Sequence, residues 1–259
     1  MSAGHAAPPA PGRVPLQEGH AGSAGVPVRA RSARLQQASL LVLKVGGAST
    51  CGAADALARF RRSGHDVVVV HGAGPQISEE VARRGLPLAF VGGRRVTTPE
   101  VLEVVRESLA AVNATLCCAI GREAVGLMGD ELGLPATQVE ELGLVGEPEP
   151  AAPAELVAAL AAGKVPVVAP LAAGPLNVNA DEMAAALAVG LGAERIWFLT
   201  DVPGLLLDGS VVEQIDADDA QSLLDRGELE GGILPKLRAA VTAARLGVRA
   251  EIGKTAVTA

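Results

Sequence analysis

The sequence predicts an α/β fold: a three-layer αβα sandwich around a central, mostly parallel sheet. Three observations lead to this prediction. Short apolar runs alternate with helical stretches over most of the chain, as in folds built from successive strand–helix units. The runs are apolar at consecutive positions, which is typical of strands buried on both faces of a parallel sheet. Glycine, aspartate or proline soon follows each run and marks a turn.

Five apolar runs are the expected strands of this sheet. Each is rich in leucine or in β-branched residues, and each has an ordinary strand length. They occupy residues 40–45, 66–70, 123–128, 165–169 and 195–199. A further pair of short strands is expected within residues 86–98, because Gly92 and Gly93 provide a tight turn between them.

Helices are expected between the strands, and three of them have clear signals. One begins at Thr98 and Pro99, a capping residue followed by one that suits the first helical position. Apolar residues then recur at helical spacing as far as Val112. The other two are expected at about residues 182–191 and 235–246.

Charge and cysteine content limit the class of partner and the compartment. The formal net charge of −7 argues against nucleic acid or an anionic membrane surface as the main partner. No apolar run reaches the roughly 20 residues that a membrane span needs. The three cysteines lack metal-ligand spacing and favour free thiols in a reducing cytoplasm. The adjacent pair Cys117 and Cys118 leaves a redox or metal site as the alternative.

Residues 1–38 differ from the rest of the chain. They are rich in alanine, glycine, proline and serine and show no sustained periodicity, which predicts a disordered N-terminal extension. An organellar transit peptide and a true translation start near residue 39 are the alternatives. Residues 39–259 are expected to form the folded domain.

Lysine is rare, and two lysines lie beside glycine pairs. The chain has four lysines against 18 arginines (22 basic residues less four). Lys44 lies inside an apolar run that Gly46 and Gly47 follow, while Lys236 follows a glycine pair at a helix start. Lysine is a compact charge suited to phosphate, and glycines let backbone amides approach it. We therefore predict phosphate binding at both places; a plain turn and a solvated surface lysine are the alternatives.

Two other segments place polar groups after strands. Residues 71–75, His-Gly-Ala-Gly-Pro, put backbone amides at the edge where α/β sheets bind ligands. The ring of His71 is expected to be a hydrogen-bonded packing group. Asn177 and Asn179 lie two residues apart, so both side chains point to one side of an extended segment. Asp181 then begins a helix, either as its cap or as a group that orients the lysines.

These motifs together resemble those of the amino acid kinase family, and within it those of the acetylglutamate kinases. The resemblance runs from about residue 40 onward and rests on LKVGG, VVVVHGAGP, FVGGRRVT, NVNADEMAAAL, LTDVPGLL and GGILPKLRAA. It implies transfer of a phosphoryl group from ATP to the γ-carboxylate of N-acetyl-L-glutamate, in arginine biosynthesis. Mg²⁺ would arrive with ATP, without a metal site of the protein. The N-terminal half would bind the acceptor and the C-terminal half ATP. Arginine-inhibited members carry an N-terminal amphipathic helix that residues 1–38 do not resemble, so we expect a cytoplasmic homodimer without arginine feedback.

The resemblance also implies roles for individual residues. Lys44 and Lys236 would approach the transferring phosphoryl group, with Asp181 between them. The residues that match acceptor-binding positions are Ala73, Gly74, Arg95, Asn177 and Asn179. The residues that match nucleotide-binding positions are Gly46, Gly47, Asp201, Val202, Pro203, Gly204, Leu205 and Leu206. The clamp on the acceptor's α-carboxylate falls to Arg95 rather than to Arg94 because of its place before the Val-Thr pair.

Departures from the family pattern leave alternatives open. The usual HGGG is HGAG here, so Ala73 is expected to displace the acceptor loop slightly. The C-terminus is short, and GKTAV is expected to be the closing strand. Arg94 stands where the family is usually apolar, which keeps open a carrier-linked aminoadipate or glutamate as acceptor. A non-catalytic sensor of the same fold is the other alternative; retention of both lysines and Asp181 argues against it.

Overall fold

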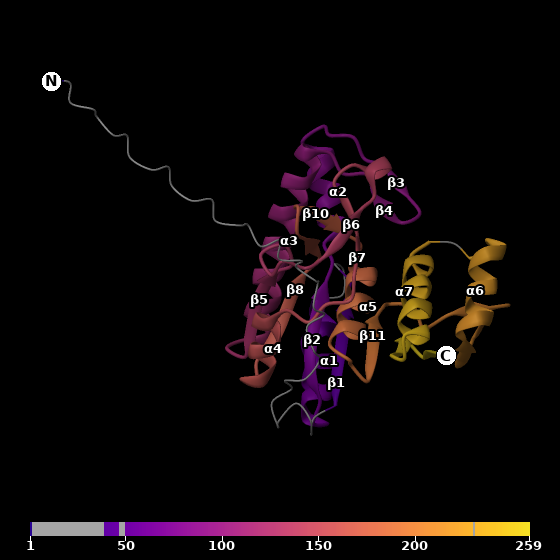
Figure 1. The fold of residues 1–259 in the computed structure, drawn as a ribbon. Helices are drawn as coiled ribbons and strands as arrows, with labels where there is room; N and C mark the ends of the chain where they lie inside the picture. Colours follow the sequence, from indigo (N-terminus) through magenta and orange to yellow (C-terminus); the bar gives the residue numbers. More distant parts are fainter. Residues whose placement is uncertain (2–38, 47–49, 230) are drawn as a thin grey trace. The chain divides into compact units, whose positions relative to one another are not determined.

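The computed structural model describes Met1 and residues 39–46, 50–229 and 231–259 (Figure 1). The chain divides into two units, Met1–Ala30 and Arg31–Ala259, and the described helices and strands all belong to the second. The disorder expected for residues 1–38 concerns a segment outside the described residues, apart from Met1. The predicted phosphate-binding Gly47 also lies outside them.

An eight-stranded sheet forms the middle of the second unit (Figure 1). Its strands are β1 Leu40–Val45, β2 Asp66–His71, β5 Ala124–Met128, β8 Val165–Ala169, β11 Arg195–Leu199, β14 Gln214–Asp216, β15 Arg249–Ile252 and β16 Thr255–Thr258. They lie in the order β14-β16-β15-β11-β1-β2-β8-β5, and β15 with β16 is the antiparallel pair in an otherwise parallel set. The five predicted strands are confirmed, and the GKTAV segment forms β16 as expected.

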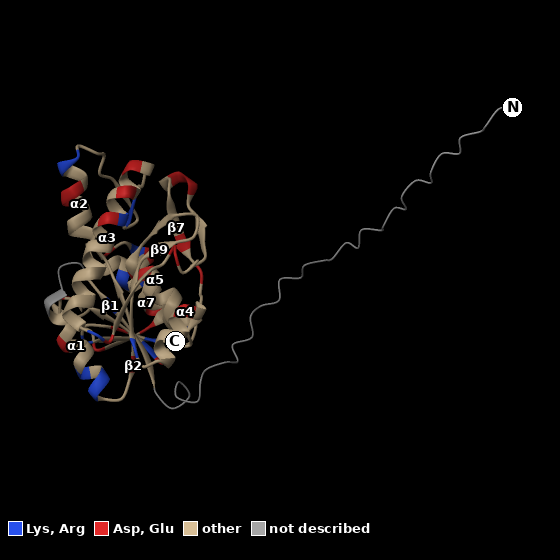
Figure 2. Ribbon diagram, turned by 90° about the vertical axis from the view of Figure 1, so that its left-hand side faces the viewer, with Lys and Arg blue, Asp and Glu red and all other residues tan. Residues whose placement is uncertain are grey.

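Helices cover both faces of this sheet and complete the three predicted layers (Figure 2). One face carries α1 Thr50–Arg62, α2 Gly74–Arg83 and α3 Pro99–Ile120. The other carries α4 Ala154–Ala161, α5 Ala180–Gly190, α6 Ala217–Arg226 and α7 Ile233–Arg245. Among the described residues, no helix combines the length and hydropathy that a bilayer crossing requires.

Strand β1 shows how the sequence places its lysine. Leu41 and Leu43 enter the core beneath α1 and α3, while Leu40 and Val42 enter the core beneath α5. Because side chains alternate along a strand, Lys44 points to the same face as Val42, toward α5. The charge therefore emerges at the carboxyl end of a fully buried strand.

The starts of the helices are set by side-chain caps. Thr98 caps α3 as predicted, since its hydroxyl accepts a hydrogen bond from the amide of Val101 at 3.3 Å. Helix α5 begins earlier than expected because Asn179 is its cap, accepting from the amide of Asp181 at 2.8 Å. Asp181 is therefore not the cap, and its carboxylate is available to other groups.

Three smaller sheets complete the unit. The predicted hairpin is confirmed as β3 Phe90–Val91 and β4 Arg94–Arg95, with Gly92 and Gly93 at φ +58° and +86° in its turn. A two-stranded sheet joins β12 Leu206–Leu207 to β13 Ser210–Val211. The sequence did not predict the four-stranded sheet β6-β7-β10-β9, formed by Ala136–Gln138, Val145–Pro148, Leu176–Val178 and Leu171–Ala172.

Candidate functional site

Two adjoining cavities open at the carboxyl ends of β1, β2 and β11, the edge where α/β sheets bind ligands. The first has a volume of about 480 Å³ and the second about 490 Å³. They share four lining residues: Thr200, Asp201, Gly232 and Lys236. The two cavities therefore meet at the start of α7.

The first cavity gathers the predicted catalytic and acceptor-binding residues. Its lining includes Lys44, Gly46, Ala73, Gly74, Arg95, Asn177, Asn179, Asp181 and Lys236. These come from β1, β4 and β10 and from the starts of α2, α5 and α7. Gly46, predicted to bind nucleotide, lines this cavity beside Lys44.

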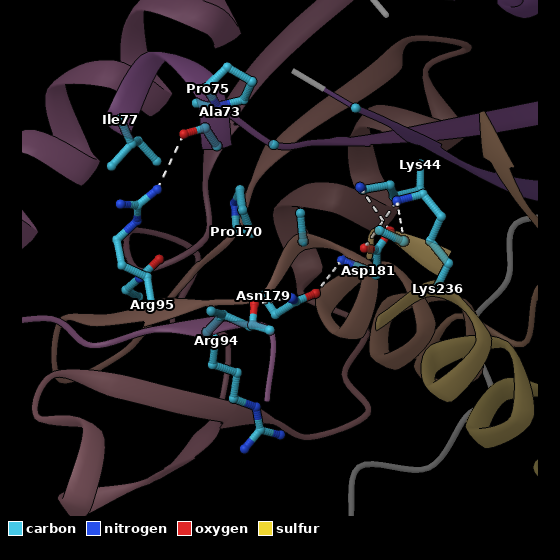
Figure 3. Close-up of a pocket in the computed structure, with 18 of the residues that line it drawn as sticks. Lys44, Ala73, Pro75, Ile77, Arg94, Arg95, Pro170, Asn179, Asp181 and Lys236 are labelled. Atoms are coloured by element: carbon cyan, nitrogen blue, oxygen red, sulfur yellow. Dashed lines mark hydrogen bonds and ion pairs between the residues drawn. The ribbon is translucent and has the colours of Figure 1, made fainter. Parts of the chain in front are cut away.

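Asp181 joins the two lysines (Figure 3). Its carboxylate lies 2.8 Å from the Nζ atom of Lys44 and 3.6 Å from that of Lys236. The side chains of Lys44 and Asp181 are 7% and 6% exposed, and that of Lys236 is 16% exposed. Within the described lining, Asp181 thus pairs with both ammonium groups, and the four cationic side chains outnumber the two carboxylates, those of Asp181 and Asp201, which leaves an excess positive charge in the cavity.

This excess charge has an electrostatic consequence for Lys236. Burial lowers the pKa of Lys236 below 10.5; attraction to Asp181 opposes the shift, and repulsion from Lys44 adds to it. An anion that entered between the two lysines would relieve that repulsion. The arrangement is therefore suited to bind an anionic group between Lys44 and Lys236.

The neighbouring arginines of β4 have opposite surroundings (Figure 3). Arg94 also lines the first cavity, but its side chain extends away from that of Arg95 (Figure 3) and pairs with Glu182 of α5 at 3.0 Å and with Glu147 of β7 at 3.5 Å. Arg95 points inward and donates to the carbonyl of Gly74 at 3.2 Å and to the hydroxyl of Ser78 at 2.9 Å. In the described part of the chain, no carboxylate pairs with Arg95.

Arg95 is consequently a buried cation without a counterion among the described residues. It is 7% exposed, its Nη1 atom has no hydrogen-bond partner there, and burial lowers its pKa. Phe90, which sequence analysis did not select, stacks over the guanidinium at 4.6 Å. The predicted hairpin pairs Phe90 directly with Arg95, so the register offered a signal for this contact.

Two helices begin at the cavities without side-chain caps. The N-cap residue of α2 is Ala73 and that of α7 is Gly232, and neither has a capping side-chain bond in the described structure. Uncapped amides at a helix start favour anions. Ala73 has φ −136°, an ordinary value for any L-residue, so alanine is accommodated here without backbone strain.

The two predicted asparagines line the first cavity but also hold the protein together. Asn177 donates to the hydroxyl of Thr97 at 3.0 Å. Asn179 caps α5 and lies 3.4 Å from the carbonyl of Gly93 through its Nδ2 atom. Their shared orientation is as predicted, yet the cap and hairpin bonds occupy both ends of the Asn179 amide.

The loop of residues 201–206 borders the second cavity. Asp201, Val202, Gly204, Leu205 and Leu206 line it, as predicted; Pro203 is absent from the described lining. The loop is fixed from behind, since the hydroxyl of buried Thr255 accepts from the amide of Leu205 at 2.8 Å. Sequence analysis missed this anchor.

His71 is a packing residue, as predicted. Its Nε2 atom lies 3.1 Å from the Nδ2 atom of Asn113, and burial lowers its pKa to about 4, so the ring is neutral near pH 7. Its place in β2 puts it on the face toward α3, opposite to Lys44.

Metal binding and thiol redox chemistry were the alternatives for the cysteine pair. Within the described residues, there is no cluster of three or more His, Cys, Asp or Glu side chains able to hold a metal ion. Cys117 is half-buried and Cys118 is exposed on α3, and both are free thiols. Cys118 is therefore not the buried apolar residue that packing alone would favour.

Comparisons with known proteins identify the family of this chain. The model of the amino acid kinase family matches residues 39–254. The acetylglutamate kinase of Rubrobacter xylanophilus is 42% identical over 221 residues, covering 82% of this chain and 87% of the relative. That of Geobacillus kaustophilus is 38% identical over 195 residues, covering 71% and 76%.

A solved structure shows the same fold at lower identity. The N-acetylglutamate synthase of Neisseria gonorrhoeae, complexed with coenzyme A and N-acetyl-glutamate, superposes with a TM-score of 0.73 at 24% identity. The match covers 87% of this chain and 61% of the synthase. On these matches, and on a family model that spans nearly all of its described residues, the chain belongs to the amino acid kinase family.

Proposed function

We propose that this chain is an ATP-dependent kinase that phosphorylates the γ-carboxylate of N-acetyl-L-glutamate, as its acetylglutamate kinase relatives are named to do. The products are N-acetyl-L-glutamyl 5-phosphate and ADP, a step of arginine biosynthesis. The observation that carries the proposal is the pair of lysines sharing one aspartate where two cavities meet.

The chemistry explains why cations dominate this site. A carboxylate oxygen attacks the γ-phosphorus of ATP, the bond to the ADP oxygen breaks, and the electron pair leaves with ADP. The attacking carboxylate is already ionised at pH 7, so the reaction needs no general base. Two negatively charged reactants must come together, so the residues contribute alignment and electrostatic stabilisation. Lys44 and Lys236 supply the positive charge, and Asp181 attracts both ammonium groups and so holds them in place.

The first cavity suits the acceptor. Arg95 is a buried guanidinium with a free Nη1 atom, and a guanidinium fork matches a carboxylate such as the acceptor's α-carboxylate. The amides at Ala73 and Gly74 add donors at the start of α2. Asn177 completes the polar lining, and we assign Asn179 chiefly to holding the loop that positions Asp181.

The second cavity suits the nucleotide. It is bordered by the 201–206 loop, and it reaches Lys236 and the uncapped start of α7. Gly46, beside Lys44 in the first cavity, is placed to contact the transferring phosphate, and we assign the same role to Gly47 from the motif alone. The proposed roles therefore divide between the N-terminal half for the acceptor and the C-terminal half for ATP.

Mg²⁺ fits as an ion carried by the nucleotide. Mg²⁺ commonly binds through substrate phosphates and one or two carboxylates rather than through a protein cage. Among the described residues that line both cavities, the acidic one is Asp201. Bound there, the ion would neutralise phosphate charge.

We further propose a cytoplasmic homodimer without arginine feedback, with residues 1–38 as an extension outside the kinase domain.

A carrier-linked acceptor is the weaker candidate. It rested on Arg94 as a possible basic contact for an acidic carrier. Arg94 is instead paired with Glu182 and Glu147, whose carboxylates compensate its charge and so weaken it as a contact for an acidic partner.

A hydroxylamine trap for acyl phosphates tests the proposal. The purified chain is incubated with MgATP and N-acetyl-L-glutamate, L-glutamate or L-aspartate, with Lys44→Met as the inactive control. The proposal predicts hydroxamate with N-acetyl-L-glutamate in large excess over the other two. Equal or greater product with an unacetylated acid would contradict it.

A further inference from the structure

The β3–β4 hairpin is the part of the first cavity that depends most on outside support. It has two residue pairs, and an isolated two-stranded hairpin is marginally stable in water. Its inner residue, Arg95, faces the proposed acceptor site. Whatever fixes the hairpin therefore also fixes the guanidinium that binds the acceptor.

Helix α7 supplies one of these supports directly. Arg238 donates from its Nη1 atom to the carbonyl of Gly92 in the hairpin turn at 3.1 Å. The turn also lies against the first turn of α7, since a Cβ atom added at Gly93 would be 3.7 Å from that of Pro235. Lys236 lies between Pro235 and Arg238 in the sequence, so the residues flanking the phosphate-binding lysine touch the acceptor-binding hairpin.

The other supports come from the start of α5. Arg94 pairs with Glu182, next to Asp181 in the first turn of α5, and Asn179 approaches the carbonyl of Gly93. The hairpin is thus tied to the helix that carries Asp181 and to the helix that carries Lys236. A shift of the hairpin would therefore strain or break contacts with both of these helices.

We propose that Arg238 is a positioning residue that couples acceptor binding to nucleotide binding through the carbonyl of Gly92. When the acceptor draws Arg95 and the hairpin inward, Arg238 holds the first turn of α7, and with it Lys236, in the phosphate-binding position. Because such coupling is reciprocal, bound nucleotide strengthens acceptor binding by the same factor. This inference rests on the proposed function, which it deepens.

Calorimetric titration of the full chain tests the coupling. The affinity for the Mg²⁺ complex of AMP-PNP is measured with and without saturating N-acetyl-L-glutamate, for wild type and Arg238→Met, which keeps the aliphatic stem but loses the donor. We expect the nucleotide affinity of the wild type to rise when the acceptor is present. In Arg238→Met the ratio of the two affinities, with and without acceptor, should be about threefold to tenfold smaller, the range that one hydrogen bond supplies. Arg238→Lys, which keeps a donor, should recover part of it.

A matched control lies on the same helix. Arg245, at the other end of α7, forms an exposed ion pair with Asp218, and within the described structure no hydrogen bond or ion pair joins it to the hairpin, so Arg245→Met should keep the wild-type coupling. Unchanged coupling in Arg238→Met would overturn the inference, as would an equal loss in Arg245→Met. A wild-type chain that binds both ligands without mutual effect would also overturn it. A chain that binds neither ligand would instead refute the proposed function.

Discussion

The two cavities use different means to hold a ligand. The first places Lys44, Arg95 and Asp181 in its wall, all nearly buried. The second is bordered by a loop whose Val202 and Leu206 are 42% and 46% exposed, and its cationic contribution is Lys236, shared with the first. Buried charges gain strength from the low local dielectric, whereas apolar contacts contribute in proportion to buried area. We therefore expect changes in the first cavity to cost far more than changes in the second.

The largest effect is expected at Lys44. Lys44→Met removes a cation from the transferring phosphoryl group, so kcat should fall by about 10²–10³, comparable with the loss of one oxyanion-type donor. Steady-state kinetics measure the loss. Lys164→Met is the control, because this exposed lysine hydrogen-bonds a surface carbonyl and should keep full activity. A Lys44→Met enzyme with near wild-type turnover would remove Lys44 from the mechanism.

The adjacent arginines provide the sharpest contrast within the first cavity. Arg95→Met should raise KM for N-acetyl-L-glutamate about 30-fold or more, since it leaves the acceptor carboxylate buried and unpaired. Arg94→Met removes a partly exposed ion pair whose partners, Glu182 and Glu147, compensate its charge, and should change this KM by about threefold or less, because such pairs contribute little. The reverse ranking of the two KM values would assign the clamp to Arg94.

The shared lysine predicts a pH dependence. The pKa of Lys236 in the free protein is lowered from 10.5 by burial, so its charge is lost at a lower pH than that of an ordinary lysine. Protonated Lys236 binds phosphate; kcat/KM for ATP should therefore fall by about tenfold per pH unit above that lowered pKa. Lys236→Arg, whose charge persists, should lose this alkaline limb. An identical limb in both enzymes would show that another group causes it.

The lowered pKa of Lys236 affects the stability of the unliganded chain in the opposite direction: activity falls as the pH rises, whereas the free energy of unfolding increases. A lysine with a lowered pKa binds fewer protons in the folded than in the unfolded state between the two pKa values. The contribution of Lys236 to the free energy of unfolding therefore rises with pH across that window. Activity and stability should diverge there, which separates loss of charge from unfolding.

The smallest effect is expected in the second cavity. Leu206→Ser removes exposed apolar surface that a bound nucleotide would cover, so KM for ATP should rise by about threefold to fivefold with kcat unchanged. Leu88→Ser, at an exposed leucine outside both cavities, is the control. If Leu206→Ser raised KM for ATP as much as Arg95→Met raises KM for the acceptor, the claim that changes in the first cavity cost more would be contradicted.

Much of the first cavity was predictable because local rules decide it. Consecutive apolar positions defined β1, and period two then fixed the direction of Lys44. Two glycines defined the hairpin turn, and the alternation along β4 requires Arg94 and Arg95 to face opposite sides. The choice between them was not local, because it depended on Glu182 and Glu147, which lie far along the chain.

The features that sequence analysis did not predict depend on short strands or on contacts between distant segments. The strands of the four-stranded sheet have two to four residues, too few for a pattern to appear. The start of α5 was misjudged by two residues, and that difference turned Asp181 from a candidate cap into the partner of both lysines. The anchoring of the 201–206 loop by Thr255 depends on a contact that joins segments 50 residues apart.

A crystal structure with MgADP, aluminium fluoride and N-acetyl-L-glutamate tests the central claim most directly. We predict that the fluoride group lies where the cavities meet, with the Nζ atoms of Lys44 and Lys236 both within about 3 Å of its fluorine atoms. The acceptor's γ-carboxylate should be in line with the ADP oxygen, and its α-carboxylate on Arg95. A complex in which either lysine faces bulk solvent, away from the fluoride, would contradict the account.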